Sequence, residues 1–203
     1  MNCPSCGAGL AQASPACPSC GLSLKALDDR FGFVPRHRAT VTDLGQILSQ
    51  PEVVKLEKQL KTFMGKFPGT AFAVILTKLP PVRKASEYCF WLINRGNFAQ
   101  SDAKLGRNRT ILLLLDAGGP GASLMVGYGL EHVLSESDLR NAVETTTPFL
   151  KGHDFFGAAL ACVQAVGPVL RKNIATLAGG SESKRSDGGE PVSGLEPASR
   201  VSL

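Results

Sequence analysis

Residues 125–134 read Met-Val-Gly-Tyr-Gly-Leu-Glu-His-Val-Leu and join the most hydrophobic run of the chain to its clearest pair of helices. Two glycines flank Tyr128, and Glu131 follows closely. Glycine gives up side-chain packing within a strand and allows the backbone unusual freedom of shape. The segment is therefore predicted to be the end of a strand that carries a candidate site.

Strands and helices alternate on both sides of this segment. Residues 110–116 predict a buried central strand, which a glycine-rich turn joins to a strand at 122–128 as an antiparallel hairpin. Another buried strand is predicted at 70–77. Helices are predicted at residues 51–66, 86–96, 135–146 and 154–172. Ser86 is the expected cap of the second helix, a capping box at 135–138 opens the third, and Pro148 is expected to end it. This order predicts an α/β fold with a mixed sheet that helices cover on both faces.

The composition indicates a globular protein with one medium domain and small additions. The chain has 203 residues, of which 43% are hydrophobic, and a net charge of +5. That charge is too diffuse to predict nucleic-acid binding. No apolar run reaches the roughly 18 residues that a membrane span needs. Because residues 1–6 also lack the features of a secretory signal, we expect a cytoplasmic protein.

The first 24 residues predict a small zinc ribbon. Cys3-Pro-Ser-Cys6-Gly recurs as Cys17-Pro-Ser-Cys20-Gly, and ten residues separate the two pairs. Each motif forms a tight turn that directs two thiolates at one point, so the two turns supply a closed site of four thiolates for structural zinc. A redox role for one Cys-x-x-Cys pair is the alternative, but the motif is doubled and no strand–helix unit surrounds it.

The remaining segments have less specific patterns. Residues 25–40 predict a basic linker, in which Gly32 and Pro35 interrupt any helix and Phe31 and Phe33 are candidates for packing on the next domain. A basic contact for nucleic acid or phosphate is the alternative for this linker. Residues 41–176 form the predicted α/β domain, and residues 177–203 predict a disordered tail. Cys89 and Cys162 lie in apolar surroundings that predict burial.

Several motifs together resemble TPM domains, a family named after thylakoid lumen proteins of photosystem repair and a nematode receptor modulator. The resemblance spans residues 41 to 170, and Gly-Tyr-Gly-Leu-Glu at 127–131 is its most specific part. The other parts are Val41-x-Asp43, the two strands 72–76 and 111–115, and Pro148 followed by Lys-Gly-His-Asp-Phe at 151–155.

The resemblance implies an α/β/α sandwich, here preceded by the ribbon. Most members of the family are exported or anchored in a membrane, some have been called acid phosphatases, and some bind a divalent cation through acidic residues at one end of the sheet. From the sequence we expect neither the export signal nor the hydrophobic tail that is usual in the family. The chain also carries Asn108-Arg109-Thr110 where the family has Asp-Asn-Gly, which removes an acidic ligand.

Two functions follow from these observations. The first is a non-enzymatic adaptor, in which the ribbon and the TPM-like domain bind a protein partner, with peripheral association with a membrane complex as one setting. The second is a metal-assisted phosphatase, in which Asp43, Glu131 and Asp154 gather the ion and Arg107 or Arg109 holds phosphate. Nucleic-acid binding ranks last, because the ribbon carries almost no cations.

The candidate residues of the cleft are Asp43, Tyr128 and Glu131. With the acidic turn replaced, we expect these residues to shape a polar cleft that binds a divalent cation such as Ca²⁺ weakly or not at all. Each acid also has an ordinary structural interpretation: Asp43 in a turn, Glu131 in the first turn of a helix and Asp154 as an N-cap. No catalytic residue is predicted.

Overall fold

The sheet of this protein has four strands in the order β1-β2-β3-β4. The computed structural model describes residues 2–11, 14–35, 40–80, 83–96, 98, 109–119 and 121–182. Strands β1 (Val41–Asp43), β2 (Ala71–Thr77) and β3 (Thr110–Asp116) run parallel, and β4 (Gly121–Val126) pairs with β3 in the opposite direction. The predicted hairpin and mixed sheet are confirmed.

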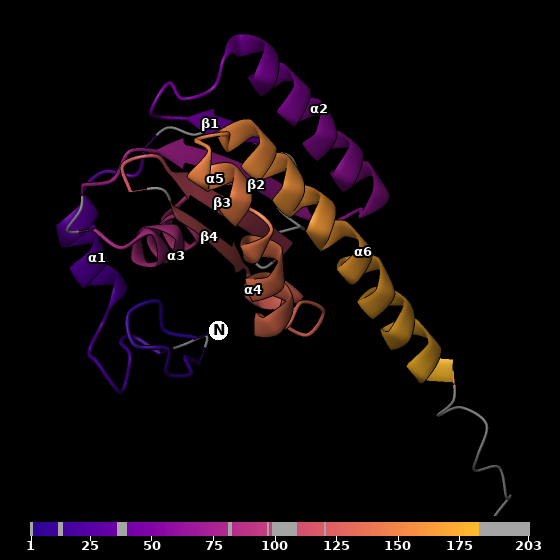
Figure 1. Ribbon diagram of the computed structural model, residues 1–203. Helices are drawn as coiled ribbons and strands as arrows, with labels where there is room; N and C mark the ends of the chain where they lie inside the picture. Colours follow the sequence, from indigo (N-terminus) through magenta and orange to yellow (C-terminus); the bar gives the residue numbers. More distant parts are fainter. Residues whose placement is uncertain are drawn as a thin grey trace, which may run out of the picture.

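Helices cover both faces of this sheet. Helices α2 (Gln50–Lys66), α4 (Glu136–Glu144), α5 (Thr147–Lys151) and α6 (Phe155–Glu182) lie over one face, and α3 (Ala85–Arg95) lies over the other (Figure 1). Alternate residues of β3 face the two cores: Leu113 points to the first and Leu112 to the second. Both are fully buried, which explains why β3 reads as an unbroken apolar run. The predicted α/β/α sandwich is confirmed.

A helix that the sequence did not predict lies within the segment that was interpreted as a linker. Helix α1 (Leu24–Phe31) begins at the N-cap Ser23 and ends where Gly32 takes a left-handed φ of 75°. Gly32 therefore terminates the helix rather than preventing it. Leu27 is fully buried in the second core, and the ring of Phe31 contacts Tyr88 and Trp91, whereas Phe33 is fully exposed. Residues 36–39 lie outside the described part of the chain.

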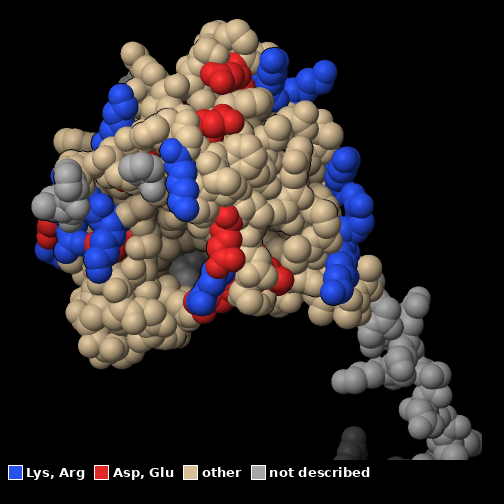
Figure 2. All heavy atoms as spheres, in the orientation of Figure 1, with Lys and Arg blue, Asp and Glu red and all other residues tan. Residues whose placement is uncertain are grey.

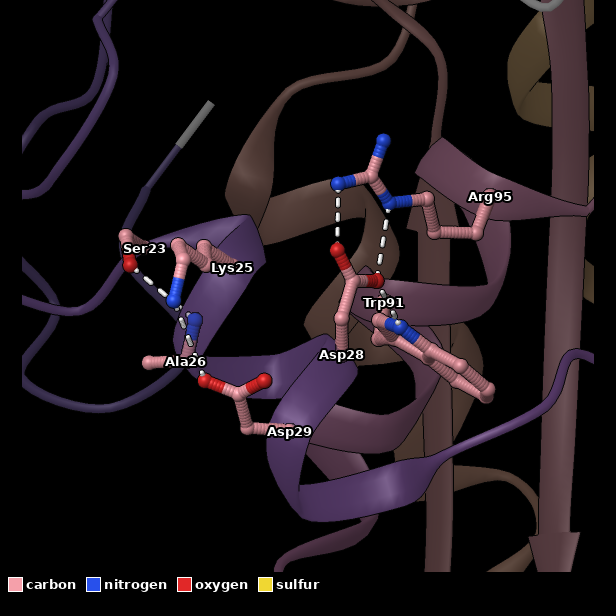
Figure 3. Close-up of polar contacts among 7 residues, drawn as sticks. All are labelled: Ser23, Lys25, Ala26, Asp28, Asp29, Trp91 and Arg95. Atoms are coloured by element: carbon pink, nitrogen blue, oxygen red, sulfur yellow. Dashed lines mark hydrogen bonds and ion pairs between the residues drawn. The ribbon is translucent and has the colours of Figure 1, made fainter.

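Polar contacts also attach α1 to α3. The carboxylate of Asp28 accepts hydrogen bonds from Trp91 Nε1 and Arg95 Nε, both at 2.9 Å, and Figure 3 shows this arrangement. Two residues further on, Arg30 pairs with the buried carboxylate of Glu87. Because Glu87 has little contact with water, the pairing satisfies a charge that would otherwise be costly to bury. Helix α1 is thus a packed layer outside α3.

Other boundaries differ from the predictions by small amounts. Lys84, not Ser86, occupies the N-cap of α3. Pro148 sits in the first turn of α5, where its missing N–H is tolerated, instead of ending the structure there. Helix α6 continues to Glu182 and passes through Pro168, so part of the predicted tail is helical; residues 183–203 lie outside the described part. None of the described helices is long and apolar enough to cross a membrane.

Truncating Leu27 tests whether α1 is a structural layer. We expect Leu27→Ala to lower the free energy of unfolding by about 2–5 kcal/mol, as for other buried leucines. The same truncation at Leu177, which is half exposed on α6, should change it by less than about 0.5 kcal/mol. Chemical denaturation measures both values. Equal effects of the two substitutions would contradict the packing of α1.

The Asp28 contact should also make the structure sensitive to acid. Hydrogen bonds from Arg95, and then from Trp91, lower the pKa of Asp28. Its stabilising contribution is therefore present above the unfolded pKa of about 3.9 and is lost as pH falls through the lower folded value. The emission of Trp91, the only tryptophan, should report this loss. Asp28→Asn should remove this transition and lower the Tm at neutral pH. The control Asp29→Asn should do neither. An unchanged acid titration of Trp91 emission in Asp28→Asn would show that Asp28 is not the group responsible.

Candidate functional site

The four N-terminal cysteines converge on one point. The sulfur atoms of Cys3, Cys6, Cys17 and Cys20 all lie within 4.8 Å of one another. Two of the distances are 3.6 Å, between Cys3 Sγ and Cys20 Sγ, and 3.7 Å, between Cys6 Sγ and Cys17 Sγ. Zinc–sulfur bonds of about 2.3 Å in a tetrahedron place the sulfurs about 3.8 Å apart. The arrangement is therefore compatible with a metal ion bound by four thiolates.

Each pair of cysteines is held by the same backbone turn. The N–H of Gly7 donates to the carbonyl of Cys3, and the N–H of Gly21 donates to that of Cys17, both at 2.9 Å. Both glycines have a left-handed φ, 79° and 74°, which explains why glycine follows the second cysteine of each motif. The four-cysteine segment (residues 2–11 and 14–23) thus consists of two equivalent turns that face each other.

The thiols also influence one another's protonation. A hydrogen bond from the backbone N–H of Cys20 lowers the pKa of Cys17 to about 7. The backbone N–H of Leu22 acts in the same direction on Cys20, but burial and the neighbouring sulfurs outweigh it and raise the pKa of Cys20 to about 12. Four thiolates so close together repel one another, and a divalent cation is the species that offsets this repulsion.

Asp43 lies at the carboxyl end of β1 and organises the turn that follows. Its Oδ2 accepts hydrogen bonds from the backbone N–H groups of Ile47 and Leu48, both at 2.7 Å. This confirms the structural interpretation of Asp43 as a turn residue. Its Oδ1 is buried and has no hydrogen-bond partner among the described residues.

Tyr128 and Glu131 lie beyond the end of β4. Tyr128 opens a 3-10 helix (Tyr128–Leu130), and Glu131 is its C-cap, so Glu131 is not in the first turn of α4 as the sequence suggested. Burial, and then the charge of Glu131, raise the pKa of Tyr128. The turn does not depend on the backbone freedom of the two glycines, because Gly127 is extended (φ −70°, ψ 158°) and neither glycine has a positive φ.

The structure does not bring Asp43 together with Tyr128 and Glu131. Strands β1 and β4 are the two outer strands, three inter-strand spacings or about 14 Å apart. The two sites also lie toward opposite ends of the sheet, because Asp43 is aligned with Leu115 of β3, whereas Val126 is aligned with Ile111. One cation therefore cannot contact both acids.

Of the remaining residues of the phosphatase hypothesis, Asp154 has a structural role. Asp154 is the N-cap of α6, and its Oδ1 accepts a hydrogen bond from the N–H of Gly157 at 2.7 Å. This confirms the capping interpretation. The side chain of Arg109 is exposed at the start of β3, and Arg107 and Asn108 lie outside the described residues.

A groove joins the four-cysteine segment to the sandwich. Its volume is about 690 Å³. One wall is formed by the four-cysteine segment with Asn2, Pro4 and Gly7, the floor by residues 122–126 of β4, and the other wall by Glu131, Leu134 and α4. Figure 2 shows a hollow between the lobe of the four-cysteine segment, at lower left, and the body of the sandwich, with charged side chains on its border. We call this site the shared groove.

Two contacts that the sequence did not predict hold the walls of the shared groove. The hydroxyl of Ser86 on α3 donates to the carbonyl of Pro4 at 2.9 Å. The side-chain amide of Asn2 donates to the carboxylate of Glu136 on α4. More than 80 residues separate the partners in each contact, so no local pattern indicates them. The four-cysteine segment thus spans from α3 to α4 past the edge of β4.

Comparison with known proteins agrees with this fold. No curated protein matches the chain. Among solved structures, the N-terminal domain of the cg2496 protein from Corynebacterium glutamicum matches with a TM-score of 0.50 and 14% identity, over 81% of this chain and 94% of that one. The BA42 protein from the psychrophilic bacterium Bizionia argentinensis matches with a TM-score of 0.54 and 12% identity, over 64% of this chain and 86% of that one. At such identities the likeness concerns the fold alone.

The family model of the TPM domain matches residues 41–169, which is more than half of the chain. The match begins at the first residue of β1 and ends within α6. It thus covers the whole sheet and leaves the four-cysteine segment and α1 outside. The chain belongs to the TPM domain family.

Proposed function

We propose that this protein is a non-enzymatic adaptor, in which a zinc-bound four-cysteine segment and the TPM domain together bind a protein partner. The shared groove is the observation that carries the proposal, because residues of both parts line a single cavity. Its volume is about 690 Å³. A partner in this groove would contact both parts at once.

Zinc is the metal that best fits the four-cysteine segment. Four thiolates close a tetrahedral site and leave no open position for a substrate, which favours a structural role. The segment buries few apolar side chains of its own; Leu10 and Leu22 pack against the second core. Metal binding is therefore expected to hold its wall of the groove in place.

The phosphatase alternative has less support. It requires Asp43 and Glu131 to share an ion, and these residues belong to opposite edges of the sheet. The acids that the hypothesis uses have structural roles at Asp43 and Asp154. No described contact favours a phosphate site beside them.

Zinc content tests the metal assignment directly. We expect the purified protein to hold one zinc ion per chain, with sulfur ligands at about 2.3 Å by X-ray absorption spectroscopy. Cys17→Ser with Cys20→Ser should abolish this zinc, because two of the four ligands are removed. Cys162→Ala, a buried cysteine of α6, is the matched control and should retain it. Retention of zinc by the double variant would contradict the four-thiolate site.

Partner capture tests the adaptor function. We expect a tagged protein to capture a specific partner from its native cell, and the partner to be lost from Cys17→Ser with Cys20→Ser by about tenfold or more, because avidity depends on both parts. Purified partner should then bind the wild-type chain directly. Cys162→Ala should capture the same set of proteins as wild type. An identical set for the double variant would exclude the four-cysteine segment as a binding element.

A further inference from the structure

The outer edge of β4 presents backbone groups that are available for pairing. The N–H of Gly127 donates to the carbonyl of Thr110 at 2.8 Å, and the antiparallel register continues from this pair along the hairpin. The alternation of an antiparallel ladder then directs the N–H and C=O groups of Ala122, Leu124 and Val126 away from β3. Within the described part of the chain, no further strand lies beyond β4.

The sequence of this edge lacks the charge and proline that often prevent strand addition, and the four-cysteine segment that passes the edge leaves the shared groove between itself and β4. Outer strands are usually protected by lysine, proline, a bulge or a covering element, because free edges cause aggregation. Residues 121–126 read Gly-Ala-Ser-Leu-Met-Val, with no charge and no proline. The shared groove runs along this strand. Its walls leave room for a narrow ligand but not for the broad surface of a folded protein. Such a site suits a single extended chain.

The charges of the shared groove specify what kind of chain would enter. Among the described residues that line it, three are glutamates and one, Arg140, is a cation. That cation is already paired with Glu136 at 3.1 Å. The groove is therefore acidic, although the whole protein has a net charge of +5. Apolar side chains of α4, Leu139 and Val143, lie between the acids and would contact alternate side chains of an extended ligand.

We propose that an extended, lysine- or arginine-rich segment of the partner protein adds to β4 as a fifth strand. This inference rests on the proposed adaptor function and specifies its binding site. The outward backbone groups of β4 pair with the segment, and basic side chains face the glutamates of the groove. The four-cysteine segment forms one wall, so loss of its metal removes part of the site.

Two other occupants fit the charges less well. Pairing of β4 with β4 of a second copy would bring two acidic grooves together, and like charges at an interface are costly. The last residues of this chain, 183–203, carry three cations and three acids and so have no net basic character. A basic segment of another protein is the complementary choice.

A synthetic peptide of alternating lysine and valine tests this proposal. The peptide has six residues, the length of β4, and carries a fluorophore for anisotropy measurements. It should bind the full chain, more weakly as salt increases, whereas the glutamate–valine counterpart should not bind. Two further versions have N-methyl groups that block the N–H groups of one strand edge or the other. We expect only one of them to bind, because an added strand uses a single edge.

Substitutions in the protein locate the site. Ala122→Pro removes an outward N–H at a strand edge, where proline is tolerated, and should weaken binding about threefold to tenfold. Glu144→Gln should weaken it about twofold and reduce its salt dependence, whereas Asp29→Asn, an equal loss of charge on α1, should leave it unchanged. Zinc content and circular dichroism confirm that each variant is folded.

Several results would overturn the inference. These are equal binding of both N-methylated peptides, binding of the acidic peptide, or unchanged affinity in both Ala122→Pro and Glu144→Gln. A dimer that Ala122→Pro converts to a monomer would assign the edge to a second copy instead. If partner capture depends on Cys17 and Cys20 but not on these two substitutions, the adaptor function stands and the β4 site is rejected.

Discussion

The carboxylate of Asp28 links helix α1 to the sandwich. It accepts hydrogen bonds from Trp91 and Arg95 of α3, and it lies one residue after Leu27, which is buried in the second core. Together these contacts attach α1 to α3 through both polar and apolar groups. Because the four-cysteine segment continues directly into α1, its place beside β4 follows from this attachment.

The sheet separates two regions that the sequence suggested as one. Asp43 follows the outer strand β1, and Tyr128 and Glu131 follow the outer strand β4. The chain leaves the sheet through the 3-10 helix that Tyr128 opens, and Glu131 then joins the wall of the shared groove opposite the four-cysteine segment. Side chains from several elements thus meet in an acidic groove. They do not form a cluster of cation ligands at one end of the sheet. This geometry connects the TPM domain to its N-terminal addition.

Local patterns predicted the features that depend on neighbouring residues. Ser135 and Asp138 form the predicted capping box, and the cysteine pairs form the predicted turns, because these contacts span only a few residues. Helix α1 was missed because Gly32 and Pro35 suggested an interruption, whereas eight preceding residues were enough for two turns that packing stabilises. Ser86 was expected to cap α3, but its hydroxyl instead contacts Pro4, more than 80 residues away.

The sequence by itself determined the α/β class, the cluster of four cysteines, the hairpin of β3 and β4 and the resemblance to TPM domains, because periodicity, ligand spacing and turn residues are local properties. Only the tertiary structure decided that Asp43 and Glu131 lie apart, that α1 is a packed layer and that the four-cysteine segment stands beside the edge of β4. These facts depend on strand order and on contacts such as that between Asn2 and Glu136, 134 positions apart. Distances of this kind arise from packing of the whole chain, which no short window of sequence contains.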